Sequence, residues 1–192
     1  MDESNLSKAE QERQTRVSSA RRRKIKKIVV WILAVILIAA AVYGLVLWSK
    51  KSAQNKPGVA VEVMTSRDHI PPNAPKPDYN SNPPTSGPHY AVPANWGIYD
   101  KELADEQLVH NLEHGGIWIS YKDSSDKTLI EQLKSITDDY SLKVIMTPRA
   151  ANPDPIDVAA WGRILRLTQF DEQQIRDFIG AFINKGPEQV PY

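Results

Sequence analysis

The 192-residue chain contains no cysteine. This excludes disulfide bonds, thiolate catalysis and cysteine-based zinc or iron-sulfur sites. The chain also has no glycine-rich phosphate loop, no dinucleotide-binding fingerprint and no internal repeat, which argues against nucleotide-binding and repeat architectures. Charge is missing from one long segment, residues 28–48, with the sequence IVVWILAVILIAAAVYGLVLW.

The uncharged segment 28–48 predicts a transmembrane helix, because at about 1.5 Å per residue it spans roughly 30 Å, the thickness of a bilayer core. Residues 1–27 carry nine Lys/Arg against four Asp/Glu, and the rest of the chain carries 15 against 19. The positive-inside rule therefore favours a membrane anchor over nucleic-acid binding for this basic run, with the N-terminus in the cytoplasm. A cleaved signal peptide is the alternative, but LVLWSKK offers no small-x-small cleavage site.

We therefore expect a cytoplasmic basic tail at 1–27, the membrane helix at 28–48, a linker at 49–57 and an extracytoplasmic domain at 58–192. Within the domain, residues 69–93 are dense in proline, which removes amide donors and restrains the backbone. This segment can be neither a helix nor a central strand. Its interleaved aromatic residues favour an ordered loop over a flexible spacer.

Helices and strands alternate in the remaining sequence. Helices are predicted at 100–116, 125–140 and 171–186, with Asp100 and Asp171 as N-caps and with Gly115 or Gly116, and Gly186, at the ends. Strands are predicted at 59–64, 117–121 and 143–148; the pattern at 158–167 allows a helix, but we favour a strand. This order indicates a compact α/β fold with a sheet of about three or four strands packed against helices.

The stretch VHNLEHGG, residues 109–116, holds the strongest chemical signal. His110 and His114 are four residues apart, so on a helix they share one face and could grip one metal ion. They lie near the end of the predicted helix, where the dipole favours a cation. The ordinary alternative is that both rings interact with free carbonyls of the last helical turn.

A third imidazole comes from His89, in the segment NPPTSGPH, where Gly87 and Pro88 give the loop a defined direction. With His89, His110 and His114 as ligands, Glu113 could be a fourth ligand, an orienting partner or a base acting on metal-bound water. The ion would be zinc or copper. His69 is expected at the surface, with a role as a further ligand left open.

Two methionines bear on the identity of that metal. Met64 and Met146 would matter for cuprous copper, because thioethers suit soft ions. Core filling is the alternative role for a methionine in a strand.

The motifs YNSNPPTSGPHY, WGIYD, LVHNLEHGGIWISY and VIMTPR resemble a bacterial domain of unknown function that is typically carried behind one N-terminal membrane helix. The resemblance covers about residues 58–190 and implies no activity. It points to these positions: Pro84, Ser86, Gly87, His89, His110, Glu113, His114 and Gly115.

These observations favour a membrane-anchored, extracytoplasmic metal-binding protein and assign no enzymatic activity. One alternative is an envelope protein that binds a protein partner without metal. Another is a zinc peptidase, since His110, Glu113 and His114 match H-x-x-E-H with Glu113 as base, although the glycines end the helix at once. Ser86 as a nucleophile lacks the strand-turn-helix elbow. No nucleic-acid partner is expected.

Overall fold

The computed structural model describes residues 3–54 and 56–188 and divides the chain into two compact units, Met1–Asn55 and Lys56–Tyr192. The first unit is one helix, α1 (Glu3–Gln54). Within the described residues, Lys26–Leu47 is the one stretch long and apolar enough to cross a membrane, and none of it is buried. This part of α1 could be a membrane anchor or a signal sequence.

The helix is longer than its apolar part. It includes most of the basic tail and runs to Gln54 in the predicted linker, because good helix formers flank the apolar stretch and an existing helix is easily extended. The side chains of residues 48–54 lie outside the described part.

The second unit is a mixed α/β domain built on a six-stranded sheet with the strand order β1-β8-β7-β5-β6-β4. Strands β4, β6 and β5 are parallel to one another, whereas β7 runs antiparallel to β5, and β8 pairs antiparallel with both β7 and β1. A separate parallel pair joins β2 and β3. The strands are β1 (Val59–Ala60), β2 (His69–Ile70), β3 (His89–Tyr90), β4 (Gly97–Ile98), β5 (Ile117–Tyr121), β6 (Val144–Pro148), β7 (Ile156–Ala160) and β8 (Arg163–Leu167).

The α/β class is confirmed, but the prediction of three or four strands in the sheet was wrong. The alternating segment 158–167 belongs to two strands, β7 and β8, because the chain turns at Gly162, whose φ of +64° suits glycine. The edge strands β1 and β4 are two residues long, too short to show an alternating pattern.

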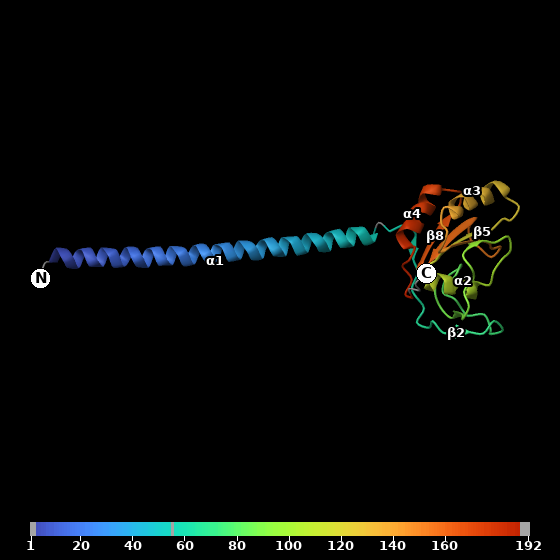
Figure 1. Ribbon diagram of the computed structural model, residues 1–192, viewed down its shortest axis with the longest axis horizontal. Coiled ribbons are helices and arrows are strands. Elements are labelled where there is room, and N and C mark those ends of the chain that lie inside the picture. Colours follow the sequence, from blue (N-terminus) through green and yellow to red (C-terminus); the bar gives the residue numbers. More distant parts are fainter. Residues whose placement is uncertain (1–2, 55, 189–192) are drawn as a thin grey trace. The chain divides into compact units, whose positions relative to one another are not determined.

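Alternation along β5 creates two packed layers, since successive strand residues point to opposite faces of a sheet. Ile117 and Ile119 pack with α3 (Lys127–Asp138) and α4 (Glu172–Phe182), whereas Trp118 packs with α2 (Asp105–Glu113). Figure 1 shows α3 and α4 on one side of the sheet and α2 on the other.

The observed start of α2 and the observed end of α4 differ from the predictions. Helix α2 begins after Ala104 rather than at Asp100, because the Tyr99 amide still bonds Met146 O at the sheet edge, 2.9 Å away. Asp171 caps α4 as predicted, accepting from the Gln174 amide at 3.0 Å. The helix ends at Phe182 rather than near Gly186, and Asn184 adopts the left-handed conformation with φ of +61°.

Candidate metal centre

Helix α2 separates an apolar side from a polar side. Leu108 and Leu112, four residues apart, are fully buried in the cluster beneath the sheet. His110 and Glu113 are each 4% exposed but lie outside this apolar cluster, and His110 contacts Tyr90 of β3. The polar residues of the motif therefore face the end of the proline-rich loop rather than solvent.

The PPTSGPH segment is fixed in a conformation that delivers His89. Ser86 Oγ accepts a hydrogen bond from the Met64 amide at 3.0 Å, so this serine holds the loop. Gly87 has φ of +121°, and a Cβ there would lie 2.8 Å from Met64 Sδ, so the position requires glycine. Its carbonyl lies 2.8 Å from Nδ1 of His89, whose side chain is fully buried.

The parallel register of β2 and β3 places His69 opposite His89. The centroids of these two rings are 5.0 Å apart, His69 and His110 are 5.1 Å apart, and His89 and His110 are 4.8 Å apart. Three imidazoles from three elements thus meet at one place. His69 is exposed, as predicted, and the other two are buried.

Main-chain carbonyls fix the tautomers of the two buried rings. Nδ1 of His89 donates to Gly87 O at 2.8 Å, and Nδ1 of His110 donates to Tyr90 O at 2.6 Å. Because a carbonyl only accepts, each neutral ring carries its proton on Nδ1 and its lone pair on Nε2. This arrangement is typical of histidines that bind a metal, whose other ring nitrogen donates to a carbonyl or carboxylate.

The free nitrogen of His89 lies against a carboxylate. Nε2 is 3.0 Å from Glu113 Oε2, yet it makes no hydrogen bond of normal geometry and is buried. The other oxygen of Glu113 is 3.3 Å from Nη1 of the half-exposed Arg67. A buried lone pair that faces a carboxylate is unfavourable, and a cation between the two, either a proton or a metal ion, removes that conflict.

One nitrogen or oxygen atom from each of four residues lies within 4.8 Å of the others: His69, His89, His110 and Glu113. A tetrahedral zinc ion with bonds of about 2.0–2.1 Å holds its ligand atoms roughly 3.3 Å apart. Side-chain movements on the order of 1 Å would close the group around an ion. Three nitrogen donors and one carboxylate oxygen are a donor set that zinc accepts.

His114 touches this group without being one of the four. It is the C-cap residue of α2, and its Nε2 lies 3.1 Å from Nε2 of His110. The same nitrogen is 3.6 Å from Oε2 of Glu188. Helical spacing thus brings the two histidines together, whereas the group of four includes His69, whose role the sequence left open.

Burial also sets the charge of the histidines on α2. Burial lowers the pKa of His110, and the neighbouring imidazoles lower it further, while the hydrogen bond to Tyr90 opposes them. Burial likewise lowers the pKa of His114, against the opposing charges of Glu188 and Glu113. Both shifts favour the neutral ring, the state in which imidazole binds a metal.

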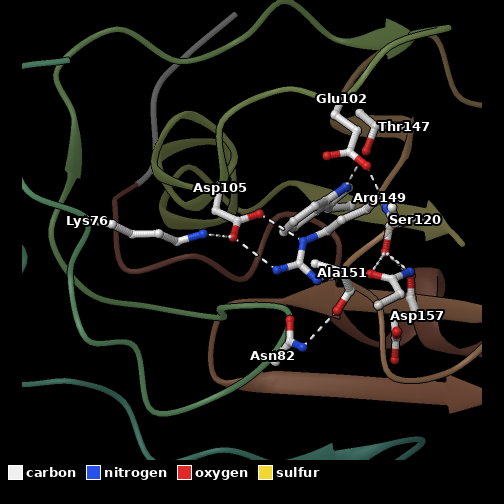
Figure 2. A network of polar contacts seen from close by, with 12 residues as sticks. Lys76, Asn82, Glu102, Asp105, Ser120, Thr147, Arg149, Ala151 and Asp157 are labelled. Atoms are coloured by element: carbon white, nitrogen blue, oxygen red, sulfur yellow. Dashed lines mark hydrogen bonds and ion pairs between the residues drawn. The ribbon is translucent and has the colours of Figure 1, made fainter. Parts of the chain in front are cut away.

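A buried ion pair fixes the start of α2 (Figure 2). Arg149 donates from Nε and Nη2 to the two oxygens of Asp105 at 2.8 and 3.0 Å, and Lys76 donates to Oδ2 at 2.9 Å. Burial raises the pKa of Asp105, but these hydrogen bonds outweigh it and lower the pKa below its ordinary value. Arg149 follows β6 and Lys76 lies in the proline-rich loop, so this carboxylate links the sheet and the loop to the start of α2.

Three residues that contribute to the site were not predicted from the sequence. Asn111 accepts from and donates to the backbone of Ala94, at 2.9 and 2.8 Å, and so ties α2 to the chain beyond the loop. Arg67 and Glu188 reach the cluster from distant segments. The sequence does not show which partner a charged surface residue contacts. For Arg67, the available signal was its position two residues before His69.

The domain is a mixed α/β domain in which three imidazoles and one carboxylate surround one point. It therefore belongs to the class of domains with a histidine cluster that could hold a metal ion. Residues 72–191 match the family described as Protein of unknown function (DUF3105), and the chain belongs to this family. The match confirms the resemblance to a domain of unknown function. No curated protein and no solved structure matches the chain.

Proposed function

We propose that this protein is a single-pass membrane protein whose extracytoplasmic domain binds a transition metal, zinc or copper, at the histidine cluster. One observation carries the proposal: the two buried rings, His89 and His110, both have Nδ1 tied to a carbonyl and Nε2 left as an acceptor. In His89 that acceptor is buried beside Glu113 without a hydrogen bond. A cation at this point would satisfy the nitrogen and the carboxylate together.

The proposed ligands are His69, His89, His110 and Glu113, with His114 adjacent to the set. His69 enters because its ring lies within reach of both buried imidazoles, which the sequence left open. Arg67 faces one oxygen of Glu113 and leaves the other for the ion. Glu113 is therefore proposed as a ligand rather than as a base.

The donor set favours zinc or cupric copper, which imidazole suits. Met146 is fully buried in the apolar cluster under α3 and α4, so its thioether fills the core. The half-buried Met64 packs against Gly87 and supports the loop. A cuprous site built on these methionines loses its main support.

Membrane topology is the second part of the proposal. The apolar stretch of α1 is exposed along its length, and Arg21, Arg22 and Lys24 come before it. The positive-inside rule then assigns residues 1–27 to the cytoplasm and the domain to the envelope side.

Metal titration of the full-length chain in detergent tests the proposal. After chelator treatment and dialysis, the protein is expected to take up zinc or copper in stoichiometric amount, measured by calorimetry and by elemental analysis. His89→Ala should abolish this uptake, whereas Glu131→Gln, an exposed residue of α3, should not change it. Wild-type protein without stoichiometric uptake would remove the proposal.

A second candidate is an envelope protein that binds a partner without metal. A groove of about 480 Å³ beside the cluster favours it, since its wall is mostly apolar and includes Val92, which is 70% exposed. Its lining residues are His69, Ile70, Pro71, Pro72, Tyr90, Ala91, Val92 and Gln107. This candidate predicts identical melting with and without chelator and co-purification of one envelope protein.

The peptidase alternative needs Glu113 as a free base next to a metal-bound water. Glu113 instead contacts His89 and Arg67. Any peptide hydrolysis that survived Glu113→Gln would dispose of this alternative.

A further inference from the structure

We propose that His110, His114 and Glu188 form a second, outer metal position beside the four-residue cluster, and that an ion passes between the two positions through His110. The inference rests on the proposed metal-binding function and adds to it a route for loading and release. The four-residue cluster is called the inner position below.

The spacing of the outer atoms suits one ion. Nε2 of His110 and Nε2 of His114 are 3.1 Å apart, and Nε2 of His114 lies 3.6 Å from Oε2 of Glu188. Ligand atoms around a tetrahedral zinc ion are roughly 3.3 Å apart. Both separations lie close to this value, and they connect the three side chains through Nε2 of His114.

The two positions share a ligand and so must be occupied alternately. Nδ1 of His110 is committed to Tyr90 O at 2.6 Å, which leaves one lone pair, on Nε2. Without metal, the short contact between the two Nε2 atoms requires one proton, carried by His114 and donated to His110. An ion can bind the outer position once the proton of His114 moves from Nε2 to Nδ1 by exchange with water, and replacement of His114 and Glu188 by the inner ligands around Nε2 of His110 then moves the ion to the inner position.

Exposure decreases step by step along this route. The side chain of Glu188 is 54% exposed and that of His114 is 14% exposed. His110 is 4% exposed and His89 is fully buried. A hydrated ion can thus lose its water in stages, exchanging each water for a protein ligand, and avoid one costly desolvation.

The segment after α4 is fastened to the end of α2, which holds Glu188 in place. The Glu188 amide donates to Glu113 O at 3.1 Å, and the Asn184 amide donates to Gly115 O at 2.8 Å. A Cβ on Gly186 would collide with the carbonyl oxygen of Glu113, so glycine is required for this close approach. These backbone contacts between the segment after α4 and the end of α2 therefore hold Glu188 near His114.

Stopped-flow zinc exchange with the full-length chain in detergent tests the route. Zn²⁺ uptake and its release to a chromogenic chelator are measured for wild type, His114→Gln and Glu188→Gln. Glu131→Gln, whose carboxylate is also exposed and lies in α3, is the matched control for loss of one negative charge. Both test variants should slow uptake and release by about tenfold while equilibrium stoichiometry stays at the wild-type value, and the control should match wild type.

Unchanged rates in both test variants would overturn the route, and so would equal slowing in the control. Loss of bound zinc at equilibrium in His114→Gln would also overturn it, because His114 would then belong to the inner position. Glu188→Gln guards against misfolding, since its side chain is exposed. If wild type takes up no zinc, the metal-binding proposal itself is wrong. If wild type takes up zinc but the two test variants exchange it at wild-type rates, only the proposed route is wrong.

Discussion

Replacing Asp157 with asparagine should remove a pH dependence of stability that is built into β7. The carboxyl group is fully buried, and neither oxygen has a hydrogen-bond partner of normal geometry. Burial raises its pKa to about 7, and Asp154 adds to the shift. Arg166 opposes it, but its Nε is 3.7 Å away, 3.8 Å from Asp154, and its side chain is 40% exposed, so its charge is shared and screened.

The direction of the effect follows from which state holds the proton. The unfolded carboxyl has a pKa of about 3.9, so between pH 4 and 7 the folded state binds the proton more tightly and stability falls as pH rises. At about 1.4 kcal/mol per pKa unit, ionising Asp157 costs the folded state about 4 kcal/mol above pH 7. Between pH 5 and pH 8 the cost rises by about 2.5 kcal/mol. Asparagine cannot ionise, so the variant lacks this term.

Denaturant unfolding of wild type and Asp157→Asn in detergent, followed by tryptophan fluorescence at pH 5 and pH 8, checks this. The stability of the variant relative to wild type should increase by about 2.5 kcal/mol from pH 5 to pH 8. The buried amide of asparagine, without partners, lowers stability by a similar amount at both values and cancels in the comparison. A difference that stays constant with pH would refute the reasoning.

Further substitutions test the framework around the site and the membrane topology. Gly116→Ala should lower the free energy of unfolding by about 1–3 kcal/mol, because its Cβ would meet Trp96 at 2.6 Å and Asn111 O at 2.7 Å. The control is Gly180→Ala in α4, where a Cβ meets open space, and this variant should be neutral or stabilising. Arg149→Met should cost about 3 kcal/mol, since it leaves the buried Asp105 with Lys76 alone; replacing both members of the pair should cost less. Because the chain has no cysteine, a single cysteine introduced at residue 18 or at residue 124 is the only thiol in its variant. An impermeant maleimide should label the cysteine at 124, and not the one at 18, in intact cells, and the reverse result would contradict the topology.

Local chemistry was readable from the sequence. Asp171 caps α4 as predicted, by accepting a hydrogen bond from the Gln174 amide, and Asp126, which was not predicted as a cap, accepts one from the Leu129 amide at the start of α3. These contacts join residues three apart, so the signal lies within one short window. The pairing of His110 with His114 follows from helical spacing in the same way.

Long-range contacts were not readable. His69 joins the cluster through the register of two strands that are two residues long, and no periodicity marks such strands. Glu188 arrives because Gly186 allows two backbones to approach closely. The helix start at Asp105 depends on Tyr99 remaining paired with the sheet edge. In each case tertiary contacts, rather than local propensity, decided the result.

The most direct measurement is zinc content at equilibrium for wild-type protein and for His69→Gln, His89→Gln and His110→Gln, each measured on the full chain after dialysis against trace zinc. Wild type should hold stoichiometric zinc, and each variant should lose at least tenfold in affinity, because each removes one nitrogen from the same ion. Wild type that holds no zinc or copper, or variants that bind as wild type does, would contradict the account.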